Sequence, residues 1–232
     1  MRRLYLHVGT HKTGTSSFEA YLLDQRVALK NRNVTVITET HRSFGEIATC
    51  LGFAHGILRN GLRTVARMTG SMPSGSSIRG WLYRRRVRIL LGQLQENESA
   101  VLSAEALCFA RTNKEAKRLR KVFTGLDLEV VPVICFRNDE DWRASWESEL
   151  HAWSERMIKS GGEGMNDIRG EWYFDRESIV SFWKQFGDVR CVDFDEAVAR
   201  DGSVLPAALE ALDLQVSGSV EAYRLRKRQE PA

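Results

Sequence analysis

The sequence has little of what marks several classes of protein. It contains only four prolines and four cysteines in 232 residues. The cysteines are widely spaced and include no C-x-x-C pair, which argues against a disulfide framework and against a zinc site. We expect all four to be buried free thiols: Cys50, Cys108, Cys135 and Cys191.

Long apolar runs are also missing. No run approaches the roughly 20 residues that a membrane-spanning helix needs, and Met1-Arg2-Arg3 leads into a short apolar segment rather than the core of a signal peptide. We therefore expect a cytoplasmic protein. With 43% hydrophobic and 28% charged residues, the chain has a globular composition, and its length predicts one domain over residues 1–232.

Charge is distributed unevenly along the chain. Between His55 and Gln95 there are eight arginines and no acidic residue, which leaves 26 basic against 30 acidic residues elsewhere. We interpret residues 55–95 as a basic, turn-rich insertion whose centre forms a mobile lid over an acceptor cleft. Its mixed basic and apolar residues suit an anionic glycan, an acidic membrane surface or a partner protein, and a solvated helix face is the plainer alternative.

Apolar and amphipathic segments alternate through the rest of the chain. Strands are predicted at 4–8, 34–38, 100–103, 128–136 and 189–194, and helices at 15–30, 113–123, 139–159, 176–186 and 204–212. This alternation predicts an α/β fold of the three-layer P-loop type, with a central, mainly parallel sheet of about five strands flanked by helices. Residues 160–164 are predicted to be a flexible connection. The basic residues at 224–228 either cap a nucleotide or form a loose tail.

A glycine-bounded loop follows the first predicted strand. Its backbone N–H groups, together with the start of the next helix, favour an anion. Lys12 adds a positive charge, and Thr15, Ser16 and Ser17 add hydroxyl donors. The lysine precedes the last glycine, whereas in the P-loop of nucleotide hydrolases it follows that glycine. The loop residues are Gly9, Thr10, His11, Lys12, Thr13, Gly14, Thr15, Ser16 and Ser17.

The run from Leu6 to Ser17 resembles the 5′-phosphosulfate loop of bacterial sulfotransferases that use 3′-phosphoadenosine 5′-phosphosulfate (PAPS). In that resemblance, Arg137 and Ser145 match the pair that binds the 3′-phosphate. Ser145 follows Asn138 by seven residues, about two helical turns, so that a guanidinium and a hydroxyl can meet on one phosphate. Asn138-Asp139 stands where many relatives have Asn-Pro, and we expect Asp139 to cap the helix.

The resemblance implies metal-free transfer of a sulfuryl group from PAPS, which leaves adenosine 3′,5′-bisphosphate. It assigns Lys12 to the bridging oxygen and places Gly9, His11 and residues 13–17 around the 5′-phosphate. The acceptor would be a hydroxyl or amine on a small molecule or carbohydrate, which could be anionic or membrane-associated, and no nucleic acid partner is expected. The sequence does not indicate the oligomeric state.

A hydroxyl acceptor also needs a base to take its proton. Three residues follow predicted strands: Glu39 and His41 after the second, and Glu105 after the third. We rank Glu105 and His41 level, with Glu39 behind. Glu105 can instead be a carboxylate that stabilises the first turn of a helix, and Glu39 and His41 can be solvated loop residues.

Three other functions remain open from the sequence. One is a P-loop nucleotide kinase or NTPase, against which the position of Lys12 argues. Another is a non-catalytic protein that binds nucleic acid or an anionic membrane through the arginine-rich segment. The third is a sulfotransferase-like fold that binds the nucleotide without turning it over.

Overall fold

The computed structural model describes residues 2–41, 45–68, 70, 72–159, 170–215 and 220–223. The predicted flexible connection at 160–164 and the basic residues at 224–228 lie outside these ranges, as do Thr69 and Ser71 of the turn-rich segment. Within the described ranges, no helix combines the length and the apolar character that crossing a bilayer requires.

Five parallel strands form the central sheet in the order β2-β5-β1-β6-β7. They match the five predicted runs closely because each run is apolar and bounded by polar or turn residues. The strands are β1 (Arg2–His7), β2 (Val34–Val36), β5 (Ser99–Ser103), β6 (Leu128–Phe136) and β7 (Arg190–Asp193).

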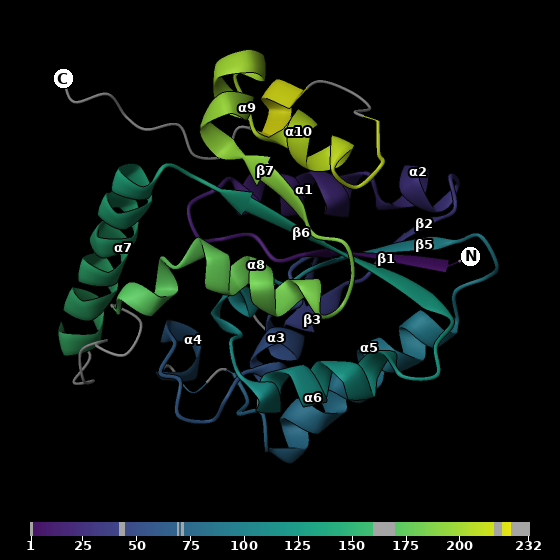
Figure 1. Ribbon diagram of the computed structural model, residues 1–232, viewed down its shortest axis with the longest axis horizontal. Helices are drawn as coiled ribbons and strands as arrows, with labels where there is room; N and C mark the ends of the chain where they lie inside the picture. The colour runs from purple at the N-terminus through teal and green to yellow at the C-terminus, as the bar shows by residue number, and fades with distance from the viewer. Residues whose placement is uncertain are drawn as a thin grey trace.

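Helices cover both faces of this sheet, which confirms the three-layer α/β fold (Figure 1). The face that carries Tyr5 packs on four helices: α1 (Thr15–Asp24), α2 (Arg26–Lys30), α9 (Phe194–Asp201) and α10 (Leu205–Glu210). The face that carries Leu4 and Leu6 packs on five: α3 (Leu51–Ile57), α5 (Ile78–Gly92), α6 (Asn113–Phe123), α7 (Asp139–Lys159) and α8 (Arg176–Lys184).

Smaller elements complete the described chain. A two-stranded antiparallel hairpin lies between β2 and α3, and its first strand holds two of the predicted site residues. These elements are β3 (Glu39–His41), β4 (Gly45–Ile47), α4 (Val65–Met68), η1 (Glu105–Phe109), η2 (Glu171–Tyr173) and η3 (Val220–Tyr223).

Several expectations need correction. The helix predicted over 15–30 is divided at Gln25 into α1 and α2, and α9 begins within the strand predicted over 189–194. The cap of α7 is Asn138, whose side chain accepts from the Asp141 N–H at 2.9 Å, whereas Asp139 pairs with Arg176. Cys191 is exposed on the edge strand β7, so only the other three cysteines are buried.

Parallel strands end at the same edge of a sheet, and the predicted site residues lie there. β1 leads into the phosphate loop, its neighbour β6 leads into Arg137, and its other neighbour β5 leads into Glu105. The strand order therefore brings Glu105 and Arg137 to the phosphate loop from about 90 and about 125 residues further along the chain, at the edge where α/β folds bind ligands.

Candidate active site

The loop after β1 takes its shape from two residues with left-handed backbone conformations. Lys12 has φ 71° and Gly14 has φ 79°. Gly14 is also the N-cap of α1, where no side chain caps the helix, and a Cβ there would approach Val204 Cγ1 to 2.5 Å. The loop thus needs glycine at 14, and it leaves the start of α1 to be completed by a ligand rather than by a side chain.

Hydroxyls inside the loop divide into two groups. Thr10 Oγ1 donates to the Cys135 carbonyl at 2.8 Å, and Thr13 Oγ1 donates to the Thr10 carbonyl. Thr15 Oγ1, by contrast, is buried with no hydrogen-bond partner within the described structure. A buried hydroxyl without a partner is costly, and an anion held by the loop would satisfy it.

The side chain of His7, beneath the loop, explains why position 9 is a glycine. Ser103 Oγ donates to Glu19 at 2.8 Å, so its oxygen accepts from Nδ1 of His7 at 2.9 Å. That leaves Nε2 of the buried ring facing the loop, where a Cβ on Gly9 would lie 2.7 Å away from it. Burial lowers the pKa of His7 to about 4, so the ring is neutral at neutral pH, and raises the pKa of Glu19 to about 7, so this carboxyl is partly protonated there.

Arg137 and Ser145 meet as their spacing predicts. Arg137 Nη1 donates to Ser145 Oγ at 3.0 Å, and Nη2 contacts Asp141 at 3.1 Å. The guanidinium is largely buried beneath Phe194, 5.3 Å from the ring centre. Its Nε atom has no hydrogen-bond partner in the described structure and lies 3.9 Å from a carboxylate oxygen of Asp195. This arrangement holds a cation in place with N–H donors left over for a ligand.

One cavity of about 580 Å³ joins the two sets of residues, and we call it the donor cavity. Glu105, the half-buried first residue of η1, also lines it. Gly9 and Thr13 do not appear in the described lining, and both residues are buried. The lining consists of His11, Lys12, Gly14, Thr15, Ser16, Ser17, Glu105, Arg137, Ser145, Trp146, Glu149, Phe194 and Val198.

Lys12 forms an ion pair with Glu149 of α7 across this cavity. The other oxygen of the Glu149 carboxylate accepts from Trp153 Nε1 at 2.9 Å. Glu149 is not among the residues predicted from the sequence. The available signal was its position four residues after Ser145, which places both side chains on one face of the same helix.

A second cavity of about 680 Å³ lies beside the first and shares His11, Trp146 and Glu149 with it; we call it the apolar cavity. Ten of the 16 described residues that line it are apolar. Those ten are Ile47, Leu51, Val65, Ala66, Met72, Ala106, Phe109, Trp146, Leu150 and Trp153, and the polar six are His11, His41, Thr49, His55, Thr64 and Glu149.

His11 is fixed at the boundary between the cavities by aromatic residues. Its Nδ1 is 2.7 Å from the Tyr173 hydroxyl, and its ring contacts those of Phe109 and Trp146, with centroids 5.0 and 4.4 Å away. Burial lowers the pKa of His11 to about 3, so the ring is neutral at physiological pH. We interpret it as a residue that positions the loop.

The three predicted bases occupy different environments. Glu105 lines the donor cavity and His41 lines the apolar cavity. Glu39 is buried rather than solvated, does not appear in the described lining of either cavity, and accepts from the N–H groups of Gly52 and Phe53 at 2.7 and 2.8 Å. Glu39 therefore caps α3, and burial raises its pKa to about 7.

Arginines of the basic segment bind backbone carbonyls. Arg67 alone donates to the carbonyls of Arg59, Leu62, His55, Leu58 and Pro73. Arg84 donates to the Gly75 carbonyl at 2.8 Å. These bonds hold the described part of the turn-rich segment against its neighbours, and a lid role for the segment stays a prediction. An exposed apolar and basic face remains on α5, made of Ile78, Arg79, Trp81, Leu82, Arg85, Arg86 and Ile89.

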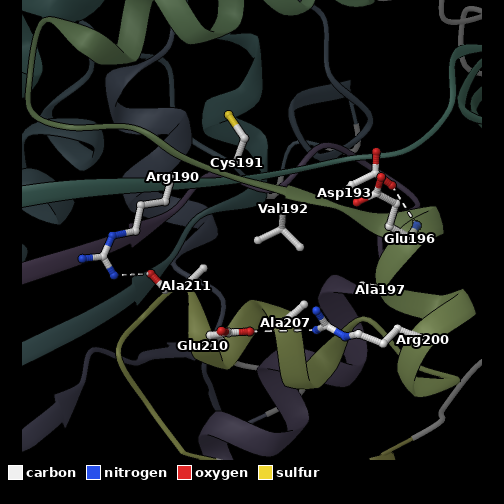
Figure 2. A pocket seen from close by; sticks show the side chains of 10 residues that line it. All are labelled: Arg190, Cys191, Val192, Asp193, Glu196, Ala197, Arg200, Ala207, Glu210 and Ala211. Atoms are coloured by element: carbon white, nitrogen blue, oxygen red, sulfur yellow. Dashed lines mark hydrogen bonds and ion pairs between the residues drawn. The ribbon is translucent and has the colours of Figure 1, made fainter.

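A third hollow, of about 360 Å³, lies between β7, α9 and α10 (Figure 2). Its charged groups satisfy one another or nearby backbone: Arg190 donates to the Ala211 carbonyl at 2.9 Å, and Arg200 lies 3.9 Å from Glu210. It shares no lining residue with the donor cavity in the described structure. We do not regard it as the active site.

Comparisons with known proteins add a distant likeness. No family model matches the chain, and no curated protein matches its sequence. Among solved structures, it is similar to one described as "Sulfotransferase Domain from the Curacin Biosynthetic Pathway", with a TM-score of 0.45 and 11% identity over 97% of this chain and 78% of that one. A likeness at this level carries no argument about chemistry, which has to come from the chain's own residues.

Proposed function

We propose that this chain transfers a sulfuryl group from PAPS to an acceptor hydroxyl or amine. One observation carries the proposal: the loop after β1 and the Arg137–Ser145 pair, two sequence motifs about 120 residues apart, line a single cavity of about 580 Å³. A cavity of this size suits a nucleotide, since ligand sites commonly fall between roughly 300 and 1,000 Å³.

The residues present fit such a donor. The Thr15 hydroxyl, Ser16, Ser17 and the start of α1 would hold the 5′-phosphosulfate, and Thr15 Oγ1 lacks any other partner in the described structure. Arg137 and Ser145, whose Nη1 and Oγ atoms lie 3.0 Å apart, would together hold the 3′-phosphate. Gly9, His11 and Thr13 would support the loop.

Lys12 would stabilise the oxygen that leaves sulfur. Sulfuryl transfer resembles phosphoryl transfer in needing an in-line acceptor and neutralisation of developing charge, with little covalent help from the protein. A sulfuryl group carries less charge than a phosphoryl group, so that lysine and backbone donors suffice in this proposal. Lys12 must leave Glu149 to do this, and that carboxylate is then exposed to whatever occupies the apolar cavity.

The first test is calorimetry with adenosine 3′,5′-bisphosphate in EDTA, with AMP and with ATP plus Mg²⁺ for comparison. We expect tight binding of the bisphosphate without metal, and its loss in Lys12→Ala but not in Lys114→Ala, an exposed lysine of α6. Preference for ATP with Mg²⁺ would instead support a nucleotide kinase or NTPase. Binding that falls steeply with salt and survives Lys12→Ala would support an anion-binding protein.

A further inference from the structure

The apolar cavity adjoins the donor cavity along a wall made of His11, Trp146 and Glu149. Of these three, Glu149 is the charged residue, since burial keeps His11 neutral at physiological pH. Anything in the apolar cavity would therefore meet the donor's reactive end at Glu149 and Lys12. This position is where an acceptor of the proposed transfer must lie.

The charge of the cavity restricts the acceptor. None of the described residues that line it is a lysine or an arginine. The charged lining residue is Glu149, which would repel an anion brought beside it. Arg67 lies close by in the chain but directs its donors to backbone carbonyls. Apart from histidine side chains, the described lining offers a sulfated or carboxylated glycan no cationic partner.

Most of the described polar lining residues already have hydrogen-bond partners, which argues against a sugar. His55 Nε2 is 2.7 Å from Thr64 Oγ1, and His55 Nδ1 is 2.9 Å from the Leu51 carbonyl. Both ring nitrogens of His55 and the hydroxyl of Thr64 therefore already have hydrogen-bond partners. Thr49 bonds to Glu19 beneath the loop. His11 bonds to Tyr173 at 2.7 Å. A molecule with many hydroxyls would lose water here without regaining its hydrogen bonds.

Aromatic and aliphatic side chains supply most of the remaining wall. Phe109, Trp146 and Trp153 present ring surfaces, and Leu51, Val65 and Met72 present aliphatic ones. Burying an apolar body against them is favourable at roughly 25 cal/mol per Å² of apolar surface. The volume of about 680 Å³ admits a molecule the size of a bicyclic or tricyclic ring system.

From these observations, which rest on the proposed function, we infer that the apolar cavity is the acceptor site and takes an uncharged, mainly apolar alcohol or phenol. Its hydroxyl lies at the shared wall beside Glu149. In the transfer, Glu149 accepts the hydroxyl proton as the acceptor oxygen bonds to sulfur, the bond from sulfur to the bridging oxygen breaks, and Lys12 donates to that departing oxygen. The products are a sulfate ester and adenosine 3′,5′-bisphosphate.

The test uses 2-naphthol as the probe, with 2-naphthoate as its anionic counterpart and N-acetylglucosamine as a neutral sugar. Binding is measured on the full chain by calorimetry. We expect 2-naphthol to bind at least tenfold more tightly than either comparison compound. Absence of 2-naphthol binding, or preference for the sugar or the carboxylate, would overturn the inference.

Variants then locate the probe. Ala66→Trp and Ile47→Trp fill the cavity from two different elements and should each weaken 2-naphthol binding at least tenfold, while Ile78→Trp, at an exposed position on α5, should leave it unchanged. Unchanged binding in both cavity variants would contradict the assignment. Adenosine 3′,5′-bisphosphate binding is measured on every sample as a check of folding, and its absence in the wild type would count against the donor class while the naphthol comparison still decides the acceptor site.

Discussion

The Lys12 ammonium and the Glu149 carboxylate form an ion pair across the boundary between the donor cavity and the apolar cavity. Lys12 follows the first strand, and Glu149 lies 137 residues later on α7. The lysine proposed to bind the donor is thus already engaged when no donor is present. Donor binding must exchange a carboxylate partner for a phosphosulfate one.

That exchange predicts that removing the Glu149 charge will strengthen nucleotide binding. Replacement of Glu149 by glutamine removes the competing charge, so Glu149→Gln should bind adenosine 3′,5′-bisphosphate about three- to tenfold more tightly, although it lacks the base for turnover. Calorimetry at moderate salt measures the affinity. The matched control is Glu147→Gln, which removes an exposed charge two residues away on the same helix and should have little effect. Unchanged or weaker binding in Glu149→Gln would show that the pair does not compete with the donor.

Arg137 gives a prediction about the 3′-phosphate. Loss of its charge-assisted hydrogen bonds should cost about 1.5 to 3 kcal/mol of binding free energy, a roughly 10- to 100-fold weaker affinity of Arg137→Ala for adenosine 3′,5′-bisphosphate. AMP has no 3′-phosphate and should lose far less. Arg143→Ala, which removes an arginine paired with Glu171 at 2.7 Å, serves as the control. Equal losses for both nucleotides would remove Arg137 from the 3′-phosphate site.

Glu39 should matter for stability rather than for catalysis. Glu39→Ala leaves the N–H groups of Gly52 and Phe53 without their partner, and we expect the free energy of unfolding to fall by about 1 to 3 kcal/mol. Urea denaturation measures this loss, and Glu105→Gln, at a half-buried cavity residue, should show a much smaller one. If Glu39→Ala retains full stability but slows transfer, the capping assignment is wrong and Glu39 returns as a candidate base.

His55, a buried histidine of the apolar cavity, predicts a pH dependence of the free energy of unfolding. Burial lowers the pKa of His55 to about 4 from its usual 6.5, so the unfolded chain takes up a proton below pH 6.5 that the folded chain does not. The contribution of His55 to stability is complete above pH 6.5 and is lost as the pH falls toward 4. The difference in unfolding free energy between the wild type and His55→Gln should therefore change by up to about 3 kcal/mol between pH 7 and pH 4. A difference that stays constant over this range would mean that His55 is charged, or exposed to water, in the folded chain.

Much of the fold follows from local sequence pattern. The strands of the central sheet are apolar runs with polar boundaries, and Thr112 begins α6 with a capping box that includes Glu115. The elements that were missed have weak or hidden signals. β3 and β4 have three residues each, and α9 follows β7 directly, with Asp193 at once the last strand residue and the cap that accepts from the Glu196 N–H at 2.9 Å.

The candidate site was predictable where a motif lies within one stretch of chain. Residues 9–17 form such a stretch, and Arg137 and Ser145 lie within one strand-to-helix connection. Glu149 and the cap on α3 were not predictable, because each depends on a partner brought close only by the fold: Lys12 for the first, and the N–H groups 13 and 14 residues beyond Glu39 for the second. Pairings of this kind leave no periodicity to detect.

Apart from the three residues that they share, the two cavities are lined by different parts of the chain. The described lining of the donor cavity comes from the connections after β1, β5, β6 and β7, whereas about half of the apolar cavity comes from residues 41–72, between β3 and α5. The Arg67 side chain holds much of that stretch together, because it donates to backbone carbonyls within it. Substitutions at the cavity-lining residues of 41–72 would therefore reshape the apolar cavity while leaving the described lining of the donor cavity in place.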